Sequence, residues 1–380
     1  MFDALLLVSY GGPEGPDEIG PFLDRLLAGK TVPPQRREAA FRKYEFLAGK
    51  SPINDACRRF LRKLEQFREE SVTEQEPSDP GVRRQPALYW GNLYAPPFLE
   101  ATVEQMKQDG VQSVLIFPAS VFGAIQSCRR YTDAVVKAVQ TSSTGFPDLK
   151  KVPLLYDHPE YIRAAADSLL NALAWTELES LNRSPARNPV VERAVSEGGG
   201  FSEKSAAAKN FAGSDEFHPL ILFAAHSLPI RDSNISQYQQ QLATHCHQIL
   251  QALRLDRFPD WALVFQSRSG RPAEPWLEPS PGTFLQRYLN GHPNLKQVIV
   301  MPVGFFFENM ETVYDLDVEF RALCDGLGIG YYRTGTLGTG DRVVRLVWNQ
   351  LRKAPSEFGL CPSRNGSCDF SCRKSNPNPE

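Results

Sequence analysis

Short apolar runs alternate with longer amphipathic stretches along this chain of 380 residues, and this pattern restricts its fold most strongly. Most runs are continuously apolar, which is typical of strands that are covered on both faces. Alternation of such strands with helices predicts an α/β fold with doubly wound parallel sheets. Helical patterns occupy Phe98–Asp109, Ser127–Thr141, Pro159–Leu173 and Ile235–Leu253. The predicted strands are Asp3–Tyr10, Ala87–Asn92, Ser113–Pro118, Val152–Tyr156, Leu220–His226, Ala262–Ser267, Gln297–Val303 and Gly328–Arg333.

The chain divides near residue 150 with about four predicted strands on each side, which indicates two similar Rossmann-like lobes with a cleft between them. We expect an N-terminal lobe at 1–150 and a C-terminal lobe at 151–353. Within the second lobe, residues 177–217 are rich in Ser, Gly, Ala, Asn and charge. Such a composition cannot bury enough apolar surface to offset its ordering entropy, so we expect a disordered insertion there. Residues 354–380 form a cysteine-containing tail.

The composition argues against several classes of protein. The net charge is −2, whereas nucleic-acid binding usually needs a basic face. No segment reaches the roughly 18 consecutive apolar residues of a membrane-spanning helix. The apolar run at the N-terminus has no basic region before it, which favours a buried strand over a signal peptide. We therefore expect a cytoplasmic protein with no transmembrane segment and no nucleic-acid partner.

A histidine ends one of the predicted strands, in the sequence LFAAHSLP at Leu222–Pro229. In an α/β fold, side chains at the carboxyl end of a strand project toward the ligand site. Neutral imidazole binds borderline metals and acts as a base near neutral pH. A hydrogen-bonded structural histidine at the turn is the alternative interpretation, and the residues alone leave both open for His226.

A predicted helix after the strand at Gln297–Val303 carries Glu308, Glu311, Asp315 and Glu319. The last three are spaced four residues apart, which places them along one helical face, where like charges repel slightly. A solvated acidic face is one interpretation. The other is a track that attracts a divalent cation and carries protons away. One histidine and one carboxylate, each following a strand, suit a first-row metal that is held transiently, whereas a structural zinc site usually has more Cys or His ligands.

Six segments occur in the order seen in ferrochelatases: LLLVSYGGPEGPDEIGPFL, KYEFLAGKSPIN, YWGNLYAPPFLEATVEQMKQDGV, LFAAHSLP, FQSRSGRPAEPWLEP and PVGFFFENMETVYDLD. The chain thus resembles the ferrochelatase family, and most closely the coproporphyrin III enzymes of Gram-positive, actinobacterial type. The resemblance implies a lyase of haem biosynthesis that inserts Fe²⁺, its substrate, into a porphyrin, preferably coproporphyrin III. The alternatives are a protoporphyrin IX ferrochelatase, a cobalt or nickel tetrapyrrole chelatase, and a non-catalytic haem or iron carrier. Enzymes of the haem pathway are candidate partners.

The resemblance also implies roles for particular residues. His226, Glu311 and Asp315 match the catalytic positions, and Tyr10 joins His226 and Glu311 as a ligand of the iron. Glu308, Asp315 and Glu319 would form the acidic track. Glu308-Asn309 stands where relatives have an Asp-His pair, so the carboxylate is kept and the imidazole is lost. Porphyrin-binding positions fall on Tyr10, Lys43, Tyr44, Ser51 and Trp276, although core packing remains the alternative for the last of these.

Three cysteines cluster in the tail, at Cys361, Cys368 and Cys372. In a reducing compartment such a cluster more often binds a metal than forms disulfides. Some ferrochelatases hold a [2Fe–2S] cluster by three C-terminal cysteines and one from the body of the chain, and the tail resembles theirs. We nominate Cys128 as the fourth ligand. A tail without metal, or one that binds zinc, is the alternative.

Overall fold

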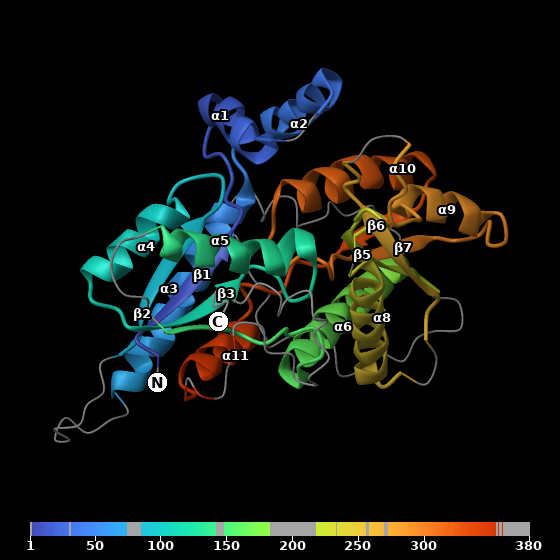
Figure 1. Cartoon of the computed structure of the whole chain (residues 1–380). Coiled ribbons are helices and arrows are strands. Elements are labelled where there is room, and N and C mark those ends of the chain that lie inside the picture. Colours follow the sequence, from blue (N-terminus) through green and yellow to red (C-terminus); the bar gives the residue numbers. More distant parts are fainter. Residues whose placement is uncertain are drawn as a thin grey trace. The chain divides into compact units, whose positions relative to one another are not determined.

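A computed structural model describes residues 2–29, 32–73, 85–141, 148–182, 218–232, 234–255, 258–269, 273–354, 356 and 359. The chain forms two compact units (Figure 1). Unit 1 comprises Met1–Leu155 and the chain from Asp341 onward, and unit 2 comprises Tyr156–Gly340. Each unit contains a four-stranded parallel sheet, which confirms the predicted α/β class with two lobes.

The sheet of unit 1 has the strand order β2-β1-β3-β4. The first strand of the unit therefore lies between the second and the third, and the connections between its parallel strands are crossovers, as in a doubly wound fold. The elements of unit 1 are β1 (Ala4–Ser9), α1 (Pro16–Leu27), α2 (Pro34–Phe46), α3 (Pro52–Thr73), β2 (Ala87–Asn92), α4 (Leu99–Gln108), β3 (Ser113–Pro118), the π-helix η1 (Ile125–Arg129), α5 (Arg130–Gln140), β4 (Asp148–Lys151) and α11 (Asp341–Leu351).

Helices cover both faces of this sheet. Leu6 and Val8 of β1 pack in one core cluster with residues of α4 and α5. On the opposite face of β3, the ring of Phe117 stacks on Phe60 of α3 with centroids 5.4 Å apart. All residues of β1 are buried, which explains why its sequence is apolar without alternation.

Helix α11 packs against α3 in unit 1, although we assigned residues up to 353 to the second lobe. The guanidinium carbon of Arg345 lies 4.9 Å from the centre of the Phe67 ring. Lys63 and Asp341 form an ion pair of 2.5 Å between the two helices. The return of the chain to unit 1 for one helix does not change the succession of strands and helices in the sequence. The sequence pattern therefore does not indicate that α11 belongs to unit 1.

Unit 2 repeats the same topology, with the strand order β6-β5-β7-β8. On one face, residues of α9, η3 and α10 join the strands in a single core cluster. Helices α6 and α8 pack against each other and contact strands of the sheet. The elements are α6 (Pro159–Asn182), β5 (Leu220–His226), α8 (Ile235–Leu253), β6 (Trp261–Gln266), α9 (Pro281–Leu289), β7 (Gln297–Met301), the π-helix η3 (Thr312–Phe320), α10 (Arg321–Gly326) and β8 (Gly330–Arg333).

Two predicted segments differ from the structure. The fourth strand is Asp148–Lys151, not Val152–Tyr156. This edge strand pairs with β3 alone among the described strands, so it needs little apolar sequence, and the apolar residues that follow it are buried in an irregular connection. Helix α6 continues through residues 177–182, which we had placed in the insertion. The rest of that insertion, 183–217, lies outside the described residues.

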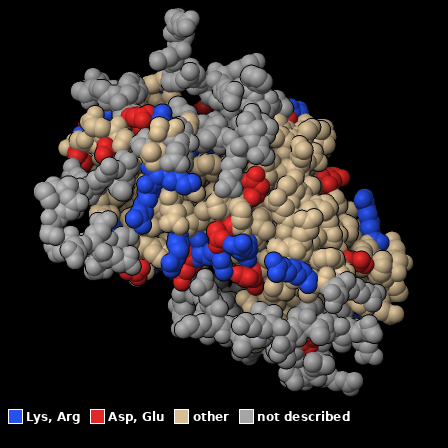
Figure 2. Space-filling model, turned by 90° about the horizontal axis from the view of Figure 1, so that it is seen from below, with Lys and Arg blue, Asp and Glu red and all other residues tan. Residues whose placement is uncertain are grey.

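Charged side chains of both signs share the surface. On the face shown in Figure 2, acidic and basic residues are intermingled among uncharged ones. None of the helices that the structure describes is long and apolar enough to cross a membrane.

Candidate functional site

His226 is the last residue of β5, at the carboxyl edge of the sheet in unit 2. Its Nδ1 lies 2.5 Å from the carbonyl oxygen of Ser227. A carbonyl accepts hydrogen bonds and cannot donate, so Nδ1 carries the hydrogen and the lone pair of the neutral ring resides on Nε2. The chain after β7 comes close here, since a Cβ on Gly304 would lie 2.6 Å from the Cα of Ala225. A larger residue at position 304 would displace the end of β5.

Glu311 directly precedes η3, and its Oε1 lies 3.5 Å from Nε2 of His226. The two side chains keep 29% and 34% of their surface exposed, so a ligand can reach both. Gln266, at the end of β6, donates from Nε2 to the backbone carbonyl of Glu311 at 3.1 Å. The structure thus brings together the histidine and the carboxylate that the sequence singles out separately.

The pKa of His226 is raised above its usual value. Burial opposes the charged form of the ring, but the negative charge and hydrogen bond of Glu311 outweigh it, and the Ser227 carbonyl and Asp315 act in the same direction. The pair is therefore suited both to accept a proton and to attract a cation.

Asp315 and Glu319 follow Glu311 along η3, with Asp315 half-buried and Glu319 exposed. Oγ of Ser267 donates to Oδ2 of Asp315 at 2.5 Å. We expected an α-helix here, whereas the structure has a π-helix, whose turn is wider. Its buried residues recur every four positions, at Thr312, Leu316 and Phe320, and each acidic residue directly precedes one of them. The spacing of the acidic row therefore follows the buried face of the wider helix.

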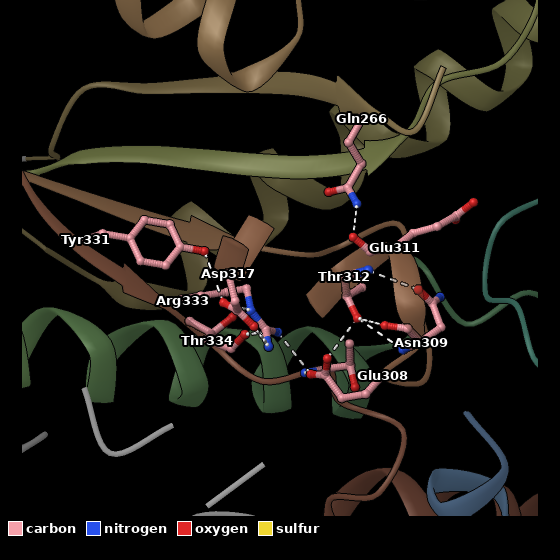
Figure 3. Close-up of polar contacts among 10 residues, drawn as sticks. Gln266, Glu308, Asn309, Glu311, Thr312, Asp317, Tyr331, Arg333 and Thr334 are labelled. Atoms are coloured by element: carbon pink, nitrogen blue, oxygen red, sulfur yellow. Dashed lines mark hydrogen bonds and ion pairs between the residues drawn. The ribbon is translucent and has the colours of Figure 1, made fainter. Parts of the chain in front are cut away.

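Glu308 belongs to a different set of contacts (Figure 3). Its Oε1 accepts from Nη1 of Arg333 at 3.0 Å and from the backbone N–H of Thr336 at 2.9 Å. Arg333, which ends β8 with 1% of its surface exposed, also donates to both carboxylate oxygens of Asp317, at 2.8 and 2.7 Å. Burial raises the pKa of Glu308, but Arg333 and the other donors more than offset this and hold it below its usual value. The side chain of Glu311 points away from this network (Figure 3).

Asn309 caps the helix that carries Glu311. The Thr312 N–H donates to its Oδ1 at 3.0 Å, and the Asn309 N–H donates to Oγ1 of Thr312 at the same distance. This reciprocal pair is a capping box with Thr at the third position. Oγ1 of Thr312 also donates to Oε2 of Glu308 at 2.8 Å, which joins the cap to the Arg333 network. The apolar and acidic patterns of the sequence do not single out Arg333 or Thr312. A charge at the end of an apolar strand, in YYRTG, is the signal that identifies Arg333.

Trp276 is buried beside the loop that follows His226. It forms a bridge with Pro229, and Oγ of Ser227 donates to the carbonyl of Leu277 at 2.8 Å. Trp276 as a whole keeps 8% of its surface exposed. In the described structure Trp276 therefore packs against the backbone that holds His226 in place.

Tyr10 directly follows β1 in unit 1. Its hydroxyl donates to the carbonyl of Gln126 in η1. Its ring stacks on Tyr94, with centroids 5.4 Å apart, and meets the edge of Tyr131 at 5.1 Å. These contacts fix the direction of the phenol ring.

The remaining predicted porphyrin positions lie in or near α2. Lys43 is half-buried in the last turn of this helix, and Tyr44 is buried with its ring edge-on to Phe22. Ser51 has 2% of its surface exposed, and its N–H donates to the carbonyl of Pro13 at 2.9 Å. The structure gives Tyr44 and Ser51 packing and backbone contacts, which do not test porphyrin binding.

Cys128 is buried in η1, and Nζ of the buried Lys151 donates to its Sγ at 3.2 Å. The backbone N–H of Lys151 donates to the carbonyl of Gly359 at 2.9 Å. Cys361, Cys368 and Cys372 lie outside the described residues. Within the described part of the chain, no three His, Cys, Asp or Glu side chains are grouped closely enough to hold a metal ion.

Comparison with known proteins gives a consistent result. A family model described as Ferrochelatase matches residues 2–186 and 201–354. A ferrochelatase from Rhodopirellula baltica is 31% identical over 362 residues, which cover 95% of this chain and 89% of that protein. A coproporphyrin III ferrochelatase from Mycobacterium marinum is 31% identical, and the matched region covers 98% of this chain and 92% of that protein. A coproporphyrin III ferrochelatase from Frankia alni is 32% identical, and the matched region covers 97% of this chain and 86% of that protein.

Proposed function

The chain belongs to the ferrochelatase family, and on this basis we propose that it inserts Fe²⁺ into coproporphyrin III. As a ferrochelatase it is a lyase-type metal chelatase of haem biosynthesis, and iron and porphyrin are its substrates. The choice of coproporphyrin III is supported by relatives of that specificity, such as those from Mycobacterium marinum and Frankia alni. The His226–Glu311 pair, with 3.5 Å between Nε2 and Oε1, is the structural observation on which the proposal rests.

Metal insertion releases two protons for each iron that enters the ring, so the site must both attract a cation and accept protons. Nε2 of His226 has the lone pair that takes the two pyrrole protons one after the other, the second after the first has left. Glu311 stabilises the imidazolium that results, and Asp315 and Glu319 continue the row of carboxylates along which the proton leaves. Tyr10, as the resemblance implies, supplies an oxygen to the iron. We assign Glu308 a positioning role, because its carboxylate is engaged by Arg333 and two further donors.

Porphyrin binding has to offset the cost of exposing the ring nitrogens to the metal. Lys43 is the predicted contact with a charge that can pair with a propionate. The contacts of Trp276 favour a structural role beside the loop that follows His226. Its backbone forms a bridge with Pro229, and the neighbouring Leu277 carbonyl accepts from Oγ of Ser227. We therefore propose that Trp276 acts through His226.

The decisive experiment compares two porphyrins. Purified protein, with Fe²⁺ under anaerobic conditions, should metallate coproporphyrin III with a higher kcat/KM than protoporphyrin IX. The reverse order would overturn the substrate assignment in favour of protoporphyrin IX. Failure with both porphyrins, in protein shown to be folded, would overturn the proposed activity.

A substitution tests the base. His226→Ala should abolish metallation while the circular dichroism spectrum and thermal midpoint stay close to those of the wild type. The matched control is His247→Ala, because His247 is exposed on α8, with its ring edge-on to Trp261. Full activity of His226→Ala would show that another group removes the pyrrole protons.

We also propose that Cys128, Cys361, Cys368 and Cys372 hold a [2Fe–2S] cluster. The described residues fit this at one end: a buried ammonium, Lys151, donates to Sγ of Cys128, and such a donor suits a thiolate. The backbone of the same lysine pairs with Gly359, two residues before Cys361 in the sequence. A cluster would add redox chemistry and would fix the tail. Anaerobically purified protein should contain iron and acid-labile sulfide, and both should be lost in Cys128→Ser. Colourless wild-type protein that contains zinc would exclude the cluster.

A cytoplasmic location and association with haem-pathway enzymes remain predictions from the sequence.

A further inference from the structure

Two arginines of unit 1 meet at Tyr94, the residue that stacks on Tyr10. Nε of Arg25, in the last turn of α1, donates to the backbone carbonyl of Tyr94 at 2.7 Å. Arg130, the first residue of α5, approaches the other end of the same residue, with Nη1 3.4 Å from the hydroxyl. Its Nη2 donates to the side-chain oxygen of Gln126 at 2.6 Å. Both arginines are half-buried.

Neither guanidinium has a carboxylate partner among the residues that the structure describes, whereas arginines close to them in the fold do. Arg37 pairs with Asp24 at 2.7 Å, and Arg129 pairs with Asp133 at 3.3 Å. A guanidinium that is partly withdrawn from water, and that has neutral partners alone, retains donors suited to an anion. Arginine binds carboxylates with two parallel hydrogen bonds, which adds geometric selectivity to the charge.

The helical segments that follow the third strand of each sheet carry different charged residues near their starts. In both units the first strand lies between the second and third, and the helix after the third strand begins as a π-helix. In unit 2 this helix carries Glu311 beside His226, at the end of β5. In unit 1 it leads into Arg130, and its Gln126 carbonyl accepts from the hydroxyl of Tyr10, which follows β1. Near the start of this segment, unit 2 thus presents carboxylates, which suit a cation, and unit 1 presents Arg130, which suits an anion.

We propose that Arg25 and Arg130 bind propionate carboxylates of the porphyrin and so select coproporphyrin III. The inference rests on the proposed function and deepens it. Coproporphyrin III carries propionates at the two positions where protoporphyrin IX has apolar vinyl groups. Arg25 and Arg130 lie at opposite ends of Tyr94, so they reach two separate carboxylates. Vinyl groups offer these arginines no acceptor, and burial against them would leave the charges without partners.

The test measures porphyrin binding and turnover separately. Quenching of porphyrin fluorescence gives the Kd for metal-free coproporphyrin III and protoporphyrin IX, and steady-state metallation gives kcat and KM. Arg25→Gln and Arg130→Gln should each raise the Kd and KM for coproporphyrin III about tenfold or more, with kcat little changed, because a charge-assisted contact remote from the chemistry is lost. The values for protoporphyrin IX should change by less than about twofold. Arg37→Gln and Arg129→Gln are the matched controls and should bind both porphyrins as the wild type does.

Further outcomes separate this inference from the proposed function. If the wild type metallates neither porphyrin, the proposed function fails with it. If the wild type prefers coproporphyrin III, but both glutamine variants bind it with unchanged Kd, the function stands and the arginine assignment is wrong. An equal loss for both porphyrins would also overturn it, because the arginines would then contact a group common to the two. Arg130→Lys keeps the positive charge, so it should bind coproporphyrin III more tightly than Arg130→Gln does. A purely structural role of Arg130 does not predict this difference.

Discussion

The proton on the imidazole of His226 is placed by the backbone. Because the Ser227 carbonyl accepts from Nδ1, the neutral ring leaves the lone pair of Nε2 on the side of Glu311. Gly304 contributes by having no side chain, since its Cβ would overlap the end of β5. His226 is therefore oriented before any substrate binds, which reduces the reorganisation that proton transfer requires.

Replacing Glu311 by glutamine should lower the pKa of His226. The carboxylate stabilises the imidazolium, and once its charge is removed the opposing effect of burial dominates. Imidazole NMR of labelled protein measures the pKa directly, with His226→Ala to assign the signal among the six histidines. Asp325→Asn is a control on α10, where the exposed carboxylate pairs with Arg321 at 3.8 Å, and should leave the pKa unchanged. An unchanged or higher pKa in Glu311→Gln would mean that Glu311 does not set the charge of His226.

At the scale of elements, Glu311 lies at the start of a helix that is capped and also hydrogen-bonded to a neighbouring strand. Asn309 and Thr312 form the capping box, and Glu308 connects Thr312 to Arg333 of β8. Asp317, further along η3, is held by the same guanidinium. Both ends of the segment that carries Glu311 are thereby tied to one buried arginine.

Arg333→Gln should destabilise unit 2 by about 3 kcal/mol or more, because it leaves Glu308 and Asp317 largely buried without a cation. Urea denaturation with far-UV circular dichroism measures the free energy of unfolding. Arg321→Gln, which breaks the exposed pair with Asp325, should cost less than about 1 kcal/mol. If the two substitutions cost the same, the Arg333 network does not stabilise the segment that carries Glu311.

The strand positions and the site residues could be predicted from the sequence to different extents. Seven strands lie where continuous apolar runs indicate them, because burial on both faces demands such runs. The strand at Asp148–Lys151 could not be found in this way, since an edge strand can be polar. His226 and Glu311 are recognisable because each lies at or after the end of a strand. Arg333 and Arg130 are not, because their side chains contact residues that are distant in the chain, such as Glu308 and Tyr94. Periodicity also could not distinguish the π-helices from α-helices, because both bury one face.

At the scale of the whole molecule, one topology is used twice with different chemistry. The order of strands is the same in both sheets, but β5 of unit 2 ends at His226, whereas β1 of unit 1 ends at Ser9 and is followed by Tyr10. The net charge of −2 conceals this difference, since acidic and basic groups nearly cancel. Bulk composition therefore excludes some partners without identifying the two kinds of ligand, a metal cation and a carboxylated ring, that the proposed reaction needs.

Stability at low pH should depend on a histidine outside the site. His245 of α8 is fully buried, its ring stacks on Tyr161 at 5.5 Å, and Nδ1 donates to the carbonyl of Tyr156 at 2.5 Å. Burial lowers the pKa of His245 to about 4, although the bond to Tyr156 opposes the shift. The unfolded chain, whose histidine has a pKa of about 6.5, takes up a proton that the folded protein rejects between those values.

The free energy of unfolding should therefore fall as the pH is lowered from about 6.5 to about 4, by about 3 kcal/mol in total from this residue. Above about pH 6.5 the contribution of His245 is constant, because the ring is neutral in both states. His245→Gln retains a donor for the Tyr156 carbonyl but cannot be protonated, so urea denaturation at a series of pH values should show a shallower slope in this range. His247→Gln, an exposed change two residues away, should keep the slope of the wild type. Equal slopes for His245→Gln and the wild type would mean that His245 is protonated without unfolding, and that its pocket admits water at acid pH.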